Sequence, residues 1–199
     1  MTDRMDLESY LGQAGDLLRR TATPGVAAPV DAAVDAIATA FANERPLLIC
    51  GNGGSAADSL HIAGELVGRF LLRRRALRAI SLAADPAVLT AWSNDEGYDT
   101  VFARQVEALG APGGVLWGLS TSGRSANVIA AFATAREIGM TTIALTGAGG
   151  GDLAASSDIL IAVPSRGTPE IQQVHMCLYH YICQQVEARC AGSVMAPEK

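Results

Sequence analysis

Five short apolar runs place the strongest constraint on what this chain can fold into. They cover residues 46–50, 78–82, 114–119, 141–145 and 159–163. Most are apolar throughout, which is the pattern of strands buried on both faces, and all but the fourth are followed by a segment with helical periodicity. Alternation of this kind predicts a parallel sheet covered by helices on both sides.

The remaining periodic segments predict the helices. Two amphipathic helices are expected before the first strand, over residues 5–20 and 30–43, with the proline-containing segment 21–29 as the break between them. Later helices are expected over residues 55–70, 86–92, 101–109, 125–138 and 168–190. No repeat, low-complexity tract or long linker divides the chain, so we interpret residues 1–199 as a single domain with a frayed tail over 192–199.

The inventory of basic residues restricts the possible chemistry. The chain has fourteen arginines and one lysine, and that lysine is the last residue, Lys199. An imine mechanism and the phosphate-binding lysine of a P-loop are therefore not expected. Three histidines, His61, His175 and His180, are the candidates for imidazole chemistry.

Charge and cysteine usage exclude further classes. A net charge of −5 and ten aromatic residues do not suit a nucleic-acid-binding protein, and the basic run within residues 69–78 is interpreted as a solvated connection. The four cysteines lie in apolar segments without a C-x-x-C pair and are expected to be reduced core residues. The N-terminus lacks an apolar signal core and no run of 18 apolar residues occurs, so we expect a soluble cytoplasmic protein without membrane contact.

Loops that follow the strands are the places to look for a site, because open parallel sheets bind ligands beyond the carboxyl ends of their strands. The third strand is followed by hydroxyl side chains at a helix start: Ser120, Thr121, Ser122 and Ser125. Hydroxyls and backbone N–H groups there fit a phosphate monoester. An ordinary N-capped turn would have the same composition.

A second candidate loop follows the first strand. It contains Asn52, Gly53, Gly54 and Ser55, whose glycines allow close approach of a ligand and whose amide can meet a sugar hydroxyl. Position 56 is alanine, so the G-x-G-x-x-G spacing is absent and NAD is not expected. A third glycine cluster, residues 147–151, is interpreted as a flexible turn.

Polar side chains on two helices complete the candidates. His61 and Glu65 are spaced i, i+4 and share a helix face, which suits two metal ligands, an acid–base pair or a plain surface pair. Gln172 and His180 share one side of the last helix but are separated by a rise of roughly 12 Å, and His175 faces elsewhere. Gln172 and His180 would act together only if their side chains bend toward each other or come from different subunits. The alternative is that they are hydrogen-bonded polar groups of the core.

Several segments together resemble a known family, the phosphoheptose isomerases, which are sugar-isomerase (SIS) domain proteins. The resemblance is carried in order by CGNGGSAADSLHIAGELVGRF, the segment at 92–98, FARQVEALG, STSGRS, IALTG and IQQVHMCLYHYI, and it runs from about residue 5 to 190. It implies a three-layer αβα sandwich with a five-stranded parallel, flavodoxin-like sheet and additional N-terminal helices. Pro169 and Glu170 depart from the more polar run that is usual in the family.

The resemblance also implies roles for individual residues. Substrate-binding positions are Asn52, Gly53, Gly54, Ser55, Glu65, Asn94, Asp95, Ser120, Thr121, Ser122, Ser125 and Gln172. The quartet that binds zinc in family members corresponds to His61, Glu65, Gln172 and His180. The family implies one Zn²⁺ per subunit and a homotetramer with active sites between subunits, in which residues 1–44 serve oligomer packing.

The expected reaction is the interconversion of sedoheptulose 7-phosphate and D-glycero-D-manno-heptose 7-phosphate, the first step of activated heptose biosynthesis. We assign Glu65 as base and His180 as acid, with zinc-assisted polarisation of the carbonyl as the competing scheme. The alternative is a non-catalytic, phosphosugar-binding relative that binds the bacterial replication initiator protein. That relative lacks the acidic residue and the final histidine of the quartet, and both are present here as Glu65 and His180.

Overall fold

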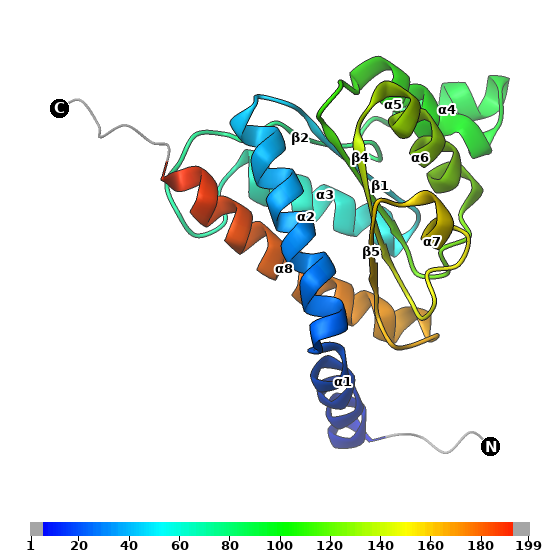
Figure 1. The fold of residues 1–199 in the computed structure, drawn as a ribbon. Coiled ribbons are helices and arrows are strands. Elements are labelled where there is room, and N and C mark those ends of the chain that lie inside the picture. The colour runs from blue at the N-terminus through cyan, green and yellow to red at the C-terminus, as the bar shows by residue number, and fades with distance from the viewer. Residues whose placement is uncertain (1–5, 193–199) are drawn as a thin grey trace.

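The fold is built on one five-stranded parallel sheet, described here for residues 6–192 of a computed structural model (Figure 1). The strands are β1 (Leu47–Gly51), β2 (Ala79–Ser81), β3 (Val115–Ser120), β4 (Thr141–Thr146) and β5 (Ile159–Ala162). Their order in the sheet is β2-β1-β3-β4-β5, and every neighbouring pair is parallel. The predicted three-layer sandwich with a flavodoxin-like sheet is confirmed.

The helices lie in the layers on either side of the sheet. They are α1 (Leu7–Thr21), α2 (Pro24–Ala42), α3 (Gly54–Val67), α4 (Pro86–Asp95), α5 (Val101–Leu109), α6 (Ala126–Ile138), α7 (Leu153–Ser156) and α8 (Thr168–Ala191), with a 3-10 turn η1 (Tyr98–Thr100). The elements α7 and η1 are four and three residues long, too short to give a periodic signal in the sequence. The expected start at residue 5 and the tail after residue 192 lie outside the described residues.

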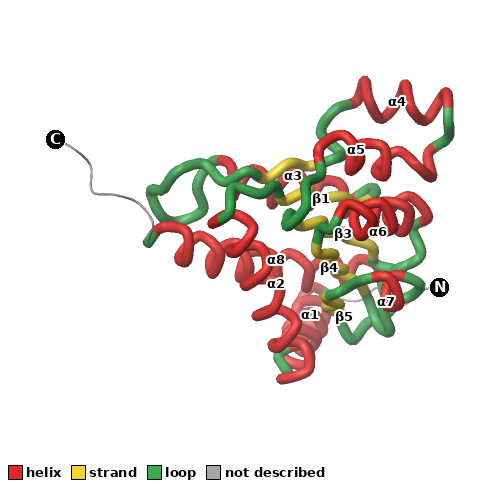
Figure 2. The backbone as a smooth tube through the Cα atoms, turned by 45° about the horizontal axis from the view of Figure 1, so that its top comes forward, coloured by secondary structure: helices red, strands yellow, loops and turns green. Residues whose placement is uncertain are grey.

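Side chains of each strand divide between two hydrophobic cores. Leu47 and Ile49 of β1 face a core formed with α2, α3 and α8, whereas Leu48 and Cys50 face a core formed with α5 and α6. This alternation follows from the two-residue repeat of a strand. Figure 2 shows the helices on both sides of the strands. The apolar runs are continuous in the sequence because both faces of the sheet are covered.

The strand order determines where a ligand can bind. β1 pairs with β2 on one side and with β3 on the other, so the chain reverses the direction of sheet growth between β1 and β3. The crevice at such a switch point lies between the loops that follow the two strands. Those loops are the Asn52-to-Ser55 and Ser120-to-Ser125 segments.

The break between the first two helices differs from the prediction. Pro24 is the first residue of α2, where its missing N–H costs nothing, but Pro29 lies inside the helix. The expectation that Pro29 ends the connection is wrong. An interior proline removes only the hydrogen bond to the carbonyl four residues earlier, and packing of α2 against α8 and β5 stabilises the helix despite this loss.

Helix α2 is also the helix within residues 6–192 that is long and apolar enough to cross a membrane, with a mean hydropathy of 1.4. A single helix of this kind near the N-terminus is weak evidence for a membrane span, because core helices have the same composition. In this fold α2 is part of one layer of the sandwich and contacts the sheet directly.

The basic run after α3 is not simply a solvated connection. The side chain of Arg74 is fully buried and donates to the carbonyl oxygens of Glu65 at 2.8 Å, Leu66 at 2.8 Å and Gly68 at 3.1 Å. Its Nε lies 3.2 Å from Oε1 of Glu187, which is 1% exposed. The prediction of a solvated loop was wrong for Arg74, because neither its burial nor its distant partner can be inferred from the residues around it.

Glu187 holds the same loop from the other side. Its carboxylate accepts the backbone N–H groups of Phe70 at 2.9 Å, Leu71 at 2.6 Å and Leu72 at 2.9 Å. Burial opposes the charged form, but these three bonds and Arg74 outweigh it and lower the pKa of Glu187. The loop is therefore fixed to α8 by a buried ion pair.

The cysteines differ in part from expectation. Cys50 and Cys183 are buried, and burial raises the pKa of each thiol to about 12, whereas Cys177 is exposed and Cys190 is half-buried. All four are free thiols. His175 is fully buried and lies 3.2 Å from the carbonyl oxygen of Thr146, so it packs beneath the end of β4.

Candidate functional site

The loop after β3 presents its hydroxyls at the start of α6. The hydroxyl of Ser125, the N-cap residue of α6, makes no capping bond and lies 2.9 Å from the hydroxyl of Ser120. Thr121 lies 3.4 Å from Thr168 at the start of α8, and the hydroxyl of Ser122 accepts the N–H of Arg124 at 3.2 Å. Because the cap bond is missing, the first N–H groups of α6 can still bind an anion.

The glycine cluster at residues 147–151 packs directly against this loop. Gly123 has a φ of +65°, and a Cβ added there would collide with the carbonyl oxygen of Gly150. The carbonyl of Gly123 accepts the N–H of Leu153 at 3.0 Å, and that of Thr121 accepts the N–H of Gly147 at 3.0 Å. Close packing requires glycine at Gly147, Gly150 and Gly151, a constraint that the interpretation as a flexible turn did not include.

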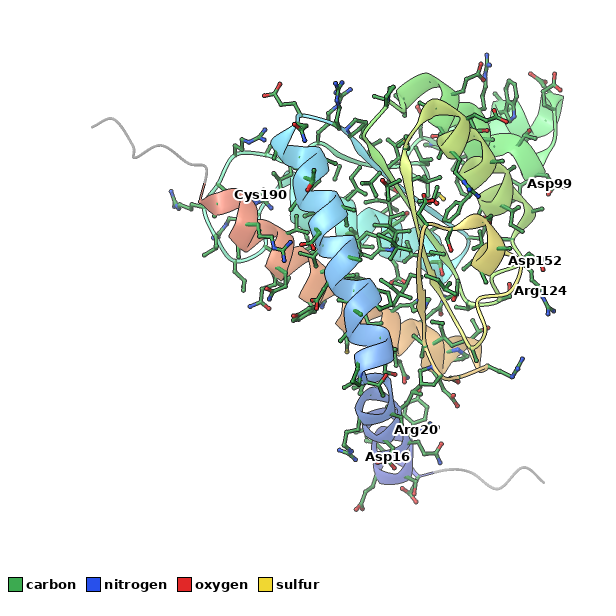
Figure 3. The ribbon with its side chains drawn as sticks, in the orientation of Figure 1. Asp16, Arg20, Asp99, Arg124, Asp152 and Cys190 are labelled. Carbon is green, nitrogen blue, oxygen red and sulfur yellow. The ribbon has the colours of Figure 1, made fainter. Side chains whose placement is uncertain are left out.

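The same loop contains one exposed cation, Arg124. Arg124 is on the outer edge of the molecule near Asp152, the residue that precedes α7, as Figure 3 shows. The buried part of the loop faces inward, with Ser120 only 4% exposed. The groups that this loop could offer to an anion are therefore mainly hydroxyls and backbone N–H groups.

The loop after β1 is joined to the loop after β3 by amide side chains. Asn52 and Asn127 exchange two hydrogen bonds of 2.9 Å, and the hydroxyl of Tyr98 donates to Oδ1 of Asn52 at 2.8 Å. The Asn52 oxygen therefore has two donors, and one N–H of its amide is left for a substrate. Sequence reasoning missed Asn127 and Tyr98, whose partners are far away in the chain.

The other residues of the first loop surround the start of α3. Gly53 has a φ of +55°, and Ser55 is buried in the first turn of the helix. A Cβ added at Gly54 would lie 2.5 Å from Nε2 of Gln172, so only glycine leaves room for that amide. Gln172 therefore lies beside this loop.

Asn94 and Asp95 are placed differently from the expected loop. They are the last two residues of α4, both are exposed, and the amide of Asn94 donates to Asp95 at 3.0 Å. Within residues 6–192 neither side chain has a hydrogen bond to the loop after β1 or to that after β3. The predicted end of the helix at residue 92 is too early, because Ser93, Asn94 and Asp95 continue the helix despite their preference for turns.

Helices α3 and α8 bring three residues of the predicted quartet together. Nε2 of His61 lies 3.1 Å from Oε1 of Glu65 and 3.4 Å from Nε2 of His180. The ring of Phe70 lies 5.6 Å from that of His180 and limits this cluster on one side. Gln172 is not part of the cluster, since it lies two turns along α8 beside Gly54.

The three ligand atoms fit a metal ion. One atom each from His61, Glu65 and His180 can be chosen so that all lie within 4.8 Å of one another. Donors about 2.0–2.2 Å from a tetrahedral zinc ion lie roughly 3.3–3.6 Å apart, close to the two spacings of 3.1 and 3.4 Å from Nε2 of His61, while the third spacing is bounded only by the 4.8 Å limit. Two imidazoles and one carboxylate leave a fourth position for water or substrate. The cluster is partly accessible, with His61 itself exposed.

Comparison with known proteins shows which family the chain belongs to. The family model described as the SIS domain matches residues 9–147. A phosphoheptose isomerase from Crocosphaera subtropica is 50% identical over 172 residues, which are 86% of this chain and 88% of that protein. The chain belongs to the phosphoheptose isomerase family. A family member from Synechocystis is 52% identical over 160 residues, 80% of this chain and 82% of that one.

Solved structures of the family have the same fold. The phosphoheptose isomerase of Neisseria gonorrhoeae superposes with a TM-score of 0.85 at 39% identity, over 92% of this chain and 97% of that one. The enzyme of Francisella tularensis gives a TM-score of 0.87 at 33% identity, over 92% and 96%. These family members therefore share with this chain both the sheet and the helices that hold the candidate site.

Proposed function

We propose that this protein is an aldose–ketose isomerase that converts D-sedoheptulose 7-phosphate into D-glycero-D-manno-heptose 7-phosphate. The observation that carries the proposal is the convergence of His61, Glu65 and His180 in a protein whose phosphoheptose isomerase relatives are about half identical to it. The product is the starting point for activated heptoses.

The phosphate of the substrate binds the hydroxyls of Ser120, Thr121, Ser122 and Ser125 and the N-terminus of α6. Asn52, Gly53, Gly54, Ser55, Asn94, Asp95 and Gln172 are proposed to contact the sugar. Binding energy from the phosphate holds the carbonyl end of the sugar near the acid–base groups, which converts proton transfer into an intramolecular step.

Glu65 and His180 carry the proton transfers in this proposal. Glu65 removes a proton from C1 of the ketose while His180 donates a proton to the oxygen on C2, which gives a cis-enediol. Glu65 then returns the first proton to C2, and the proton on the C1 oxygen passes to His180, which gives the aldose and restores both groups. Each well-placed group contributes on the order of 10²–10⁴ in rate.

A zinc ion, one per subunit, is the proposed cofactor. His61, Glu65 and His180 would hold it, with Gln172 as a further ligand if another subunit brings it close. When bound, zinc would supply Lewis-acid polarisation of the carbonyl oxygen. This scheme competes with proton transfer by Glu65 and His180, because a carboxylate bound to metal is a poorer base. The spacing of the three ligand atoms supports this assignment.

We also propose a cytoplasmic homotetramer with active sites between subunits, in which residues 1–44 serve packing and residues 1–199 form one domain. Figure 1 shows α1 projecting from the body of the molecule. It presents Leu7 at 72% and Leu11 at 58% exposure, the kind of apolar surface that a partner subunit covers. An intersubunit site would also bring together Gln172 and His180, which lie apart within one chain.

The test is an isomerase assay with sedoheptulose 7-phosphate and detection of the aldose. Glu65→Gln and His180→Gln should each lower kcat by roughly 10²–10⁴-fold. Glu107→Gln is a matched control, because Glu107 is an exposed carboxylate on α5 paired with Arg104. Wild-type turnover by both site variants would refute the assignment. No turnover by the wild-type protein, together with saturable binding to the initiator protein, would favour the non-catalytic alternative.

A further inference from the structure

A buried tyrosine lies directly behind the candidate metal ligands. Tyr179 on α8 is 0% exposed, and its hydroxyl lies 3.0 Å from Nδ1 of His61 and a longer 3.4 Å from Oδ1 of Asp58. The rings of Tyr179 and His61 meet edge to face, with centroids 5.4 Å apart. The hydroxyl thus contacts the ring nitrogen of His61 that points away from Glu65 and His180.

The number of available protons decides how these three groups pair. A phenol has one proton to donate, and a carboxylate has only lone pairs. The other carboxylate oxygen of Asp58, Oδ2, is buried and has no hydrogen-bond partner among residues 6–192. If Tyr179 donated to His61, a carboxylate at Asp58 would lack any partner, which is costly for a buried charge.

The favoured pattern therefore runs in one direction. The hydroxyl of Tyr179 donates to Asp58, and its oxygen accepts the proton on Nδ1 of His61. A neutral imidazole with its proton on Nδ1 has a lone pair on Nε2. That lone pair faces Oε1 of Glu65 at 3.1 Å and the ring of His180.

We propose that Tyr179, oriented by Asp58, is a positioning residue that keeps His61 in the Nδ1–H form, so that Nε2 is free to bind a cation. This inference rests on the proposed metal centre, to which it adds Tyr179 and Asp58 as residues that orient a ligand. Partners of this kind orient ligating histidines and raise their basicity, and their loss costs 10–100-fold in metal affinity. The Nε2 lone pair of His61 and Oε1 of Glu65, 3.1 Å apart, then form a place for a cation.

The first measurement reads the wild-type protein directly. In protein labelled with ¹⁵N-histidine and free of metal, magic-angle-spinning NMR at pH 8 distinguishes the protonated from the unprotonated ring nitrogen of His61. Spectra of His61→Gln, His175→Gln and His180→Gln assign the signals. A proton on Nδ1 is expected. A proton on Nε2 would overturn the proposal, whether or not the protein proves to be an isomerase.

The second measurement is zinc affinity by competition with a chromophoric chelator. Tyr179→Phe should weaken zinc binding by roughly 10–100-fold. Tyr181→Phe is the control, since Tyr181 lies on the same helix and is 46% exposed. Equal affinities for the two variants would overturn the role of Tyr179.

Asp58→Asn serves if Tyr179→Phe does not fold. An asparagine can still accept from Tyr179, but its amide carries no charge, so an intermediate loss of affinity is expected. Affinity equal to wild type would count against Asp58 as the orienting group. If the wild-type protein binds no zinc, the proposed metal centre is wrong, and the ¹⁵N spectrum still decides the form of His61.

Discussion

Replacing Arg74 by methionine should strongly destabilise the protein, although the residue lies in a run of arginines. Methionine retains the length and apolar stem of the side chain and removes the guanidinium. The carboxylate of Glu187 would then be buried beside three backbone N–H groups without its cation. The carbonyls of Glu65, Leu66 and Gly68 would also lose the guanidinium as a donor, although that of Leu66 keeps the N–H of Leu77.

The contacts set the size of the effect. Breaking a buried ion pair by removing one partner costs about 3–5 kcal/mol. Both side chains are almost completely buried, at 0% and 1% exposure, so solvent screening does not reduce this figure. The three N–H groups still stabilise the carboxylate. We therefore expect a loss at the lower end of the range, about 3 kcal/mol in the free energy of unfolding.

Urea unfolding at one fixed protein concentration measures this loss, since oligomers unfold in a concentration-dependent way. The matched control is Arg73→Met, because Arg73 is exposed; its effect should stay within about 0.5 kcal/mol. The double variant Arg74→Met with Glu187→Gln should lose less stability than the sum of the two single variants, since the two side chains pair with each other. Equal losses for Arg73→Met and Arg74→Met, or additive losses in the double variant, would refute the reasoning.

Three further predictions follow from the site and the core. Burial lowers the pKa of His175 from 6.5 to about 4, so on acidification the unfolded chain takes up this proton before the folded protein does. The free energy of unfolding, measured by urea titration, should therefore fall by about 3 kcal/mol between pH 6.5 and 4. In His175→Gln this part of the pH dependence should be absent. Gly123→Ala should lower kcat/KM by roughly 10²-fold, because it displaces the proposed phosphate-binding loop. Gly149 has a φ of +83° but open space for a Cβ, so Gly149→Ala should cost only about 1–2 kcal/mol of stability. Equal kcat/KM values for the two variants would contradict this. Chelation followed by dialysis should abolish turnover and zinc should restore it; full activity in protein free of metal by elemental analysis would reject a catalytic zinc.

Much of the fold could be predicted because its signals are local. Each strand is a short apolar run, and the hydroxyls of the Ser120-to-Ser125 loop adjoin a helix start, so a few residues determine each feature. His61 and Glu65 could be paired because a helix turn fixes their spacing. That His180 belongs with them followed from the family resemblance and not from spacing.

The features that sequence reasoning missed depend on distant partners. Asn127 pairs with Asn52 across 75 positions, and Tyr98 reaches the same side chain across 46. No local pattern distinguishes these residues from ordinary surface groups. Arg74 was misread for the same reason, because its burial depends on Glu187 in another helix. Pro29 shows the converse case, in which packing of α2 overrides a local signal for a break.

The close fit between Gly123 and the glycine cluster has a consequence for how the substrate arrives. A loop that must fold around its ligand gives up about 1–2 kcal/mol per ordered residue of backbone entropy at the moment of binding. Here the backbone of Gly123 is already held against Gly150 and Leu153. If phosphate binds this loop as proposed, it meets a backbone that is already ordered around Gly123. Association should then be fast and single-phase, with no slow conformational phase.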